Sequence, residues 1–374
     1  MRRPLAVVLS VALLAALASC SQPSASADQP TSGSAATGTS TSTSPSTASS
    51  PLPAVGEPTD VATGLRVPWG VAFLPDGGAL VAERPTGRVV RIGADGGTSE
   101  AGTVPGVRDL GEGGLLGLAV APDDPATVYA YFTSSNDDNR VVRMPYRNGR
   151  LGEPTPLLTG IPSAGNHDGG RIVVGPDGNL WIGTGDAGQG EQAQDRDALG
   201  GKILHIRRDG SIPPENPFPS SPVWSYGHRN VQGLAFDSTG QLWATEFGQN
   251  TWDELNKVVK GGNHGWPEVE GRGERDGFVD PQVVWPTADA SPSGLAIVGD
   301  VAYVGALRGA RLWQVPVAGG TAGRPVAVLD GDLGRLRTVV AAPDGGGLWL
   351  TTSNTDGRGS PRAGDDRLVR VALS

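Results

Sequence analysis

The feature that most constrains the fold is a segment that occurs six times, in which a Pro-Asp or Asp-Gly type of turn precedes a short apolar strand. The turn of each copy holds one aspartate: Asp76, Asp123, Asp177, Asp237, Asp300 and Asp344. Each turn is typical of a β-hairpin, and no stretch shows a sustained helical period. Units of about 40 to 60 residues are typical of propeller blades, whereas a β-sandwich needs shorter and more even spacing. The sequence therefore predicts an all-β fold, a six-bladed β-propeller with four-stranded blades.

The first 55 residues differ from the rest. Arg2-Arg3 precede an apolar run from Leu5 to Ala18, which is typical of a signal peptide and short for a membrane span. The run ends in Leu17-Ala18-Ser19-Cys20, which resembles a bacterial lipobox, and Cys20 is the only cysteine of the chain. The resemblance implies a lipoprotein signal peptide over residues 1–19 and lipid attachment at Cys20. An ordinary signal peptide with an incidental cysteine is the alternative.

Residues 20–55 are almost entirely Ser, Thr, Ala, Gly and Pro, a composition that cannot bury enough apolar surface to fold. We interpret them as a flexible tether, which leaves residues 56–374 for the propeller. The lipid implies a mature protein that is exported, anchored in the cell membrane through Cys20 alone and facing outside the cytoplasm. The net charge of −9 makes nucleic acid an unexpected partner, because no basic face is available to neutralise phosphates.

Loops on a propeller converge at one end of the central channel, so polar residues far apart in the sequence can share one pocket. His167 lies between glycines in the segment from Gly165 to Arg171, where it is accessible and can change protonation near neutrality. We interpret it as a candidate base, and Asp186 as a candidate carboxylate that orients it. The alternative for both is an ordinary turn residue. The other histidines lie in a strand (His205), a tight turn (His264) and a polar cluster (His228).

Several cations could bind an anionic ligand. Arg229 and Asn230 suit a ligand rich in carbonyl oxygens. Strand alternation places Arg335 and Arg337 on one face, and with Arg308 they form a candidate set for binding carboxylates. Each arginine taken alone could instead be a solvated surface cation. The acidic loop from Thr245 to Glu254 could supply oxygens to calcium, although it lacks a calcium-motif spacing.

Taken in order, these motifs resemble the soluble glucose and aldose sugar dehydrogenases that use pyrroloquinoline quinone (PQQ). The resemblance extends over residues 57–374 and rests on short motifs, among them Val67-Pro-Trp-Gly, Gly111-Glu-Gly-Gly-Leu-Leu-Gly, Gly227-His-Arg-Asn, Gly261-Gly-Asn-His-Gly-Trp-Pro and Arg335-Leu-Arg337. It implies a six-bladed propeller that oxidises an aldose at the anomeric carbon to a lactone and passes electrons to an unidentified acceptor. PQQ and calcium are the implied cofactors.

The resemblance also implies roles for individual residues. His167 corresponds to the general base and Asp186 to its partner, while Arg229 and Asn230 would hold the quinone oxygens. Arg308, Arg335 and Arg337 would bind the PQQ carboxylates. The implied ligands of one calcium are the carbonyls of Gly248 and Gln249, and those of a second are Glu254 and the carbonyl of His264.

Three positions depart from the family pattern. Asn166 replaces an aspartate beside the base, Glu112 stands where a glutamine contacts cofactor or substrate, and Gln249 replaces a proline. These changes keep a second hypothesis open, a non-catalytic cell-surface binding propeller on the same scaffold. A metal-dependent lactonase fits less well, since the sequence offers no obvious carboxylate-rich cluster at the channel. The retained His167, Arg229 and paired arginines favour the enzyme, because a neutral glycan has little use for so many cations.

Overall fold

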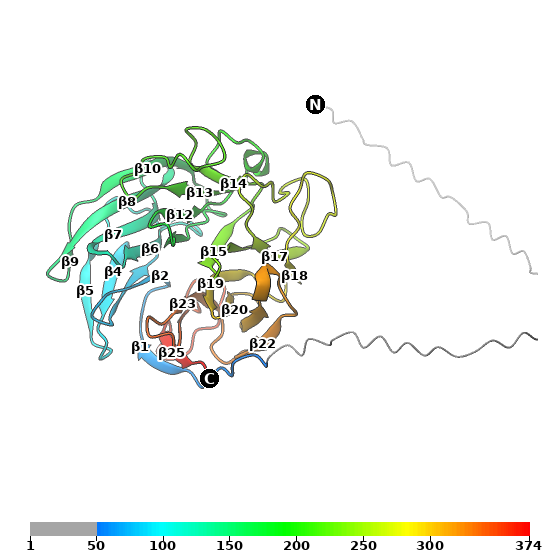
Figure 1. Cartoon of the computed structure of the whole chain (residues 1–374). Helices are drawn as coiled ribbons and strands as arrows, with labels where there is room; N and C mark the ends of the chain where they lie inside the picture. The colour runs from blue at the N-terminus through cyan, green and yellow to red at the C-terminus, as the bar shows by residue number, and fades with distance from the viewer. Residues whose placement is uncertain (1–50) are drawn as a thin grey trace, which may run out of the picture. The chain divides into compact units, whose positions relative to one another are not determined.

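The computed structural model describes residues 51–374. The signal peptide predicted over residues 1–19, the lipidation site Cys20 and the tether up to residue 50 lie outside the described residues. Within residues 51–374 the chain forms antiparallel four-stranded sheets, which confirm the predicted six-bladed β-propeller. Figure 1 shows these sheets arranged around a common centre. No helix of residues 51–374 is long and apolar enough to cross a membrane.

The blades follow one another along the chain. Blade 1 consists of β2 (Pro68–Phe73), β3 (Ala79–Glu83), β4 (Arg88–Ile92) and β5 (Thr98–Thr103). Blade 2 consists of β6 (Leu115–Ala121), β7 (Asp124–Thr133), β8 (Asp138–Arg147) and β10 (Thr155–Pro162), with the short β9 (Arg150–Leu151) paired to β8. Blade 3 consists of β11 (Ile172–Val174), β12 (Leu180–Gly183), β13 (Lys202–Ile206) and β14 (Val223–Tyr226).

The second half of the ring repeats this order. Blade 4 consists of β15 (Val231–Phe236), β16 (Leu242–Glu246), β17 (Trp252–Lys257) and β18 (Val283–Pro286). Blade 5 consists of β19 (Pro292–Val298), β20 (Val301–Ala306), β21 (Leu312–Pro316) and β22 (Val326–Val328). Blade 6 consists of β23 (Leu336–Ala341), β24 (Gly347–Thr352), β25 (Leu368–Ala372) and β1 (Thr59–Ala62). Two 3-10 turns, Gly190–Ala193 and Ala318–Gly320, are the only helical segments among residues 51–374.

The sixth blade closes the ring with strands from both ends of the described chain. β1 pairs antiparallel with β25, with Thr59 opposite Arg370. The first and last strands therefore lie side by side, blue and red in Figure 1. Val55 forms a bridge with Leu373, and Leu52 packs against the core between blades 5 and 6. Residues on the N-terminal side of Gly56 therefore also contact the propeller.

The six turn aspartates all lie between the first and second strands of their blades, as the repeat predicts. In four turns the carboxylate accepts the backbone N–H two residues further on: Asp76, Asp177, Asp237 and Asp344. This local hydrogen bond fixes the hairpin and explains why the turn was visible in the sequence.

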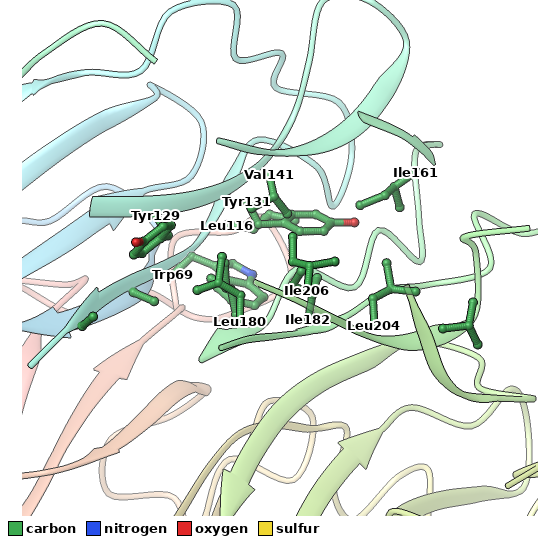
Figure 2. Close-up of a cluster of buried hydrophobic side chains, with 14 residues drawn as sticks. Trp69, Leu116, Tyr129, Tyr131, Val141, Ile161, Leu180, Ile182, Leu204 and Ile206 are labelled. Carbon is green, nitrogen blue, oxygen red and sulfur yellow. The ribbon is translucent and has the colours of Figure 1, made fainter. Parts of the chain in front are cut away.

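The apolar core lies between neighbouring blades. Figure 2 shows the cluster between blades 2 and 3, in which Leu116 and Tyr131 pack with Ile182 and Leu204. Comparable clusters fill the other gaps around the ring. Because each blade is buried against two others, the loops at the ends of the strands stand on a rigid scaffold.

Candidate active site

Most of the loops that carry predicted site residues lie at one end of the blades, whereas His264 lies in the long loop between β17 and β18. In an antiparallel blade, the loop entering the first strand and the loop leaving the second strand lie at the same end. His167, Arg229 and Arg335 precede first strands, whereas Asp186 and Gly248 follow second strands. The turn aspartates lie at the opposite end. The topology therefore gathers these side chains without any clustering in the sequence.

His167 and Asp186 form a hydrogen-bonded pair. Nδ1 of His167 lies 2.7 Å from Oδ1 of Asp186, and the imidazole is 14% exposed while the carboxylate is buried. An ionised carboxylate can only accept a hydrogen bond, so Nδ1 carries the proton and Nε2 is left as an acceptor. Asp186 is held in turn by the indole N–H of Trp266 at 2.7 Å and the N–H of Gly188 at 2.8 Å. The imidazole is thus positioned with its basic nitrogen free.

The ionised state of Asp186 is stabilised by its surroundings. Burial opposes ionisation, but hydrogen bonds from His167, Gly188 and Trp266 outweigh it and hold the pKa of this carboxyl below its usual range. The carboxylate therefore remains charged near neutral pH. It keeps His167 in the tautomer that can accept a proton at Nε2.

The backbone around His167 is unusually constrained. His167 has a φ of 57°, in the left-handed region that non-glycine residues rarely adopt. Its N–H donates to Oε2 of Glu112 at 3.1 Å. A Cβ on Gly185 would lie only 1.8 Å from the carbonyl oxygen of His167, so position 185 requires glycine. Loops of blades 2 and 3 together fix the base.

Arg229 lies in the same cavity as the histidine. This cavity has a volume of about 570 Å³, and its lining includes Asn166, His167, Asp186, Arg229 and Trp266. The guanidinium lies 5.2 Å from the Trp266 ring, and its Nη1 donates to the carbonyl of Gly248 at 2.7 Å. Burial lowers the pKa of Arg229 from its ordinary value, yet the group is still a cation at neutral pH. The cavity therefore combines a base with a positive charge.

Asn230 follows Arg229 in the chain but does not line this cavity. The side chain is buried, and its Oδ1 accepts the N–H of Gly169 at 3.0 Å. Within the part of the chain that the structure describes, its Nδ2 has no hydrogen-bond partner, and neither has Nε of Arg229. Buried donors without partners are rare in folded proteins and indicate a missing acceptor.

The predicted carboxylate-binding arginines lie apart from His167. As alternation predicts, Arg335 and Arg337 point to the same place, where both contact Asp356 at 2.9 and 3.8 Å. Arg337 lines a cavity of about 290 Å³ together with Glu112, and Arg335 lines another of about 360 Å³ with the exposed Arg308. Burial lowers the pKa of Arg337 to about 9, so it remains charged at neutral pH.

The residues expected to share one pocket line three cavities in this structure. His167, Asp186 and Arg229 share one cavity, whereas the three arginines line two others. Carboxylates pair with arginines that line these two cavities. Asp356 pairs with Arg335, and Glu112 pairs with Arg358. Glu112 lines the cavity of Arg337 and also accepts the backbone N–H of His167, a residue that lines the first cavity.

Three of the four residues implied for calcium lie together in the fold. Gly248, Glu254 and His264 line a small buried cavity of about 10 Å³ beside Glu246, while Gln249 is exposed and lines the His167 cavity. Burial and the neighbouring charge of Glu246 raise the pKa of Glu254 to about 8. Two buried carboxylates that repel each other form a place where a cation would be stabilised.

Sequence reasoning missed four residues of the site. Trp266 holds Asp186, and Asp356 and Arg358 pair with charged groups predicted to contact a ligand. The fourth, Glu270, accepts four consecutive backbone N–H groups from Gln249 to Trp252 on one oxygen. This carboxylate stiffens the loop in which Gln249 replaces a proline. Trp266 lies within the motif Gly261-Gly-Asn-His-Gly-Trp-Pro and could have been found there. The other three residues are revealed only by their tertiary contacts.

The fold and the site together define a propeller protein that combines a histidine–aspartate pair with an anion-binding set of arginines. The sequence model of the glucose/sorbosone dehydrogenase family matches residues 65–369. Among solved structures, the PQQ-bound aldose sugar dehydrogenase from Streptomyces coelicolor is 50% identical, with a TM-score of 0.83, and the match covers 87% of this chain and 100% of that one. 

Curated proteins give similar matches. Aldose sugar dehydrogenase YliI of Escherichia coli (strain K12) is 31% identical over 330 residues, which cover 78% of this chain and 88% of that protein. Quinoprotein glucose dehydrogenase B of Acinetobacter calcoaceticus is 33% identical over 258 residues, 58% of this chain and 54% of that protein. The chain belongs to the glucose/sorbosone dehydrogenase family, which confirms the predicted resemblance to PQQ-dependent glucose and aldose sugar dehydrogenases. Membership supports PQQ-dependent aldose or glucose dehydrogenase activity in general terms.

Proposed function

We propose that this chain is an exported, lipid-anchored quinoprotein that oxidises aldose sugars at the anomeric carbon to lactones, with His167 as general base. The observation that carries the proposal is the 2.7 Å contact between His167 and Asp186 in a cavity that also holds Arg229. A PQQ-bound aldose sugar dehydrogenase at 50% identity supports the cofactor.

The residues fit PQQ. Nδ2 of Asn230 and Nε of Arg229 and Arg337 are buried donors that lack acceptors among residues 51–374. Quinone oxygens and carboxylates are acceptors of the kind that these donors need. Arg229 and Asn230 would hold the quinone oxygens, and Arg308, Arg335 and Arg337 would bind carboxylates. When bound, PQQ supplies a two-electron acceptor for the hydride that leaves the anomeric carbon.

The protein's own residues supply the proton chemistry. Nε2 of His167 takes the proton of the anomeric hydroxyl, and the ionised Asp186 stabilises the imidazolium that forms. Arg229 stabilises negative charge that develops on an oxygen bound beside it. Asn166 lines the same cavity and is exposed, in a position to contact cofactor or sugar. Glu112 holds the backbone of the base.

Calcium is part of the proposal. The raised pKa of Glu254 and its position in one small cavity with Gly248 and His264 support a structural cation at this place. The carbonyl of Gly248 accepts the guanidinium of Arg229 at 2.7 Å, so a calcium bound by Gly248 and Gln249 would have to share that oxygen with the arginine. Calcium bound by Glu254 and the carbonyl of His264 would contribute to stability rather than to proton transfer.

A titration tests the proposal most directly. Cofactor-free protein in the presence of calcium is mixed with PQQ and binding is followed by absorbance, after which glucose-dependent reduction of a dye is measured. We expect saturable binding and turnover. Absence of saturable PQQ binding by the folded protein would contradict the proposal and favour the non-catalytic binding propeller.

The base is tested by His167→Ala and Asp186→Asn. We expect His167→Ala to lower kcat by about 10²–10⁴-fold while PQQ affinity and the circular dichroism spectrum stay unchanged. Asp186→Asn should lower kcat by about 10³–10⁴-fold, because an amide N–H facing Nδ1 favours the tautomer whose Nε2 cannot accept a proton. Wild-type turnover in either variant would show that another group is the base.

The anchor is tested by Cys20→Ser. We expect wild-type protein to fractionate with membranes and the variant to become soluble or remain uncleaved, since a serine cannot form the thioether that carries the lipid. Metabolic labelling with palmitate provides an independent measurement, in which the wild-type band is labelled and the variant band is not. Equal labelling of both would contradict lipid attachment at this residue.

A further inference from the structure

The ion pair between Glu112 and Arg358 connects two loops on different blades. Glu112 lies in the loop that enters β6 of blade 2, and Arg358 lies in the loop that leaves β24 of blade 6. Nη1 of Arg358 is 2.8 Å from Oε1 of Glu112. The carboxylate is 18% exposed and the guanidinium 59% exposed, so the arginine side of the pair faces solvent.

Each oxygen of Glu112 has a different partner. Oε1 accepts Arg358, whereas Oε2 accepts the backbone N–H of His167 at 3.1 Å. Burial disfavours its ionised form, but the contacts with Arg358 and with this N–H outweigh that effect and lower the pKa of Glu112. One carboxylate therefore joins the loop of His167 to a solvent-facing cation.

Arg358 also lies among the predicted carboxylate-binding residues. It lines the cavity of Arg337 and Glu112, and it lines the cavity of Arg308 and Arg335 as well. Arg335 and Arg337 already share Asp356. Arg358 thus lines both cavities, and its present partner is a carboxylate that the protein itself supplies.

We propose that Arg358 is an additional anchor for a carboxylate of PQQ, and that Glu112 is its internal counter-ion, which the cofactor carboxylate displaces on binding. This inference rests on the proposed function, because it needs PQQ as the ligand. The exchange swaps one charge-assisted hydrogen bond for another of the same kind. After the exchange, Glu112 keeps its hydrogen bond with the N–H of His167, and its negative charge lies beside an anionic ligand. Because the two negative charges repel each other, the wild-type protein binds the cofactor less tightly than its arginines alone would allow.

Two variants test the exchange, and PQQ affinity measured by absorbance titration is the readout. Glu112→Gln keeps an oxygen for the His167 N–H but removes the competing charge, and we expect PQQ to bind about five- to tenfold more tightly. Arg358→Gln should bind PQQ about tenfold more weakly and show a smaller loss of affinity with added sodium chloride. In the Glu112→Gln background, Arg358→Gln should lower PQQ affinity by a larger factor than it does in the wild-type background, because Glu112 no longer competes for Arg358.

A matched control is the ion pair between Arg208 and Asp123, which also joins two blades, at 2.7 Å, but lies at the end with the turn aspartates. Arg208→Gln should leave PQQ affinity unchanged. Thermal unfolding of each variant establishes that it is folded, and Arg358→Gln provides a test on an exposed side chain should Glu112→Gln destabilise the protein.

The outcomes separate this inference from the proposed function. Wild-type protein that binds no PQQ contradicts both. Wild-type protein that binds PQQ, together with a Glu112→Gln variant of equal or weaker affinity, overturns the exchange while the proposed function stands. Unchanged affinity and salt dependence in Arg358→Gln overturn its role as an anchor.

Discussion

At the scale of single residues, the loop that carries His167 also contains a carboxylate that the proposed chemistry does not use. Asp168 follows His167 and is almost fully buried. Its Oδ1 accepts Nδ2 of Asn139 at 3.0 Å and the N–H of Ala164 at 3.2 Å, whereas Oδ2 has no partner in the described part of the chain. Burial raises the pKa of Asp168 to about 7. The side chain is therefore largely neutral in the folded protein at mildly acidic pH.

This raised pKa predicts a pH dependence of stability. Between about pH 4 and 7 the folded protein keeps a proton on Asp168 that the unfolded chain has lost, so the free energy of unfolding falls as pH rises through this window. Asp168→Asn should remove this contribution. The fall in the free energy of unfolding between pH 4 and 8 should then be smaller than in wild type by on the order of 3 kcal/mol. Urea unfolding at several pH values measures it, with Asp123→Asn as an exposed control. Parallel profiles for wild type and Asp168→Asn would contradict the assignment.

At the scale of elements, the site depends on the close approach of two loops at the end of blade 3. The loop entering β11 carries His167, and the loop leaving β12 carries Gly185 and Asp186. The N–H of Asp186 also donates to the carbonyl of Arg229 at 2.9 Å, which attaches the loop entering β15 to the same place. The packing of the strands fixes where each loop begins and ends. Backbone contacts between the loops then fix the positions of His167, Asp186 and Arg229 relative to one another.

Gly185→Ala tests this arrangement. The new Cβ would lie 1.8 Å from the carbonyl oxygen of His167, so the loop must move and the contact between His167 and Asp186 must lengthen. A displacement of about 1 Å is enough to lower kcat on the order of 10²-fold. Gly165→Ala is the matched control in the loop that carries His167, because its Cβ would meet nothing within 4 Å. Equal activity and stability of the two variants would argue against a backbone constraint at position 185.

At the scale of the whole molecule, ring closure depends on a strand far from its partner in the sequence. β1 completes blade 6 by pairing with β25, and Ala62 and Leu65 join the core between blades 6 and 1. Without β1, the edge of β25 would be exposed and the last blade would have three strands.

Truncation measures the contribution of this closure. A chain that starts at residue 51 should unfold at the same temperature as the full chain, because every described contact is retained. A chain that starts at residue 63 should unfold about 5–10 °C lower, since each kcal/mol lost shifts the midpoint of a domain of this size by ~2 °C. The shortened chain should also bind PQQ more weakly. Arg335 precedes β23 and Arg337 lies within it, so a loss of order in blade 6 would displace both arginines. Equal midpoints would show that β1 is dispensable.

The sequence by itself determined the fold and most of the candidate site. The turn aspartates act through hydrogen bonds within two residues, so the six-blade repeat is encoded locally and could be predicted. His167, Asp186, Arg229 and the paired Arg335 and Arg337 stood out because their local settings were distinctive.

Tertiary structure alone decided which of these residues meet. The pairing of β1 with β25, the holding of Asp186 by Trp266 and the pairing of Arg358 with Glu112 join segments on different blades or at opposite ends of the chain. No local pattern marks such contacts, because they exist only once the ring has closed. The same closure distributes the arginines among separate cavities. It also places Asp356 beside Arg335 and Glu112 beside Arg358, so these cations already have a carboxylate partner.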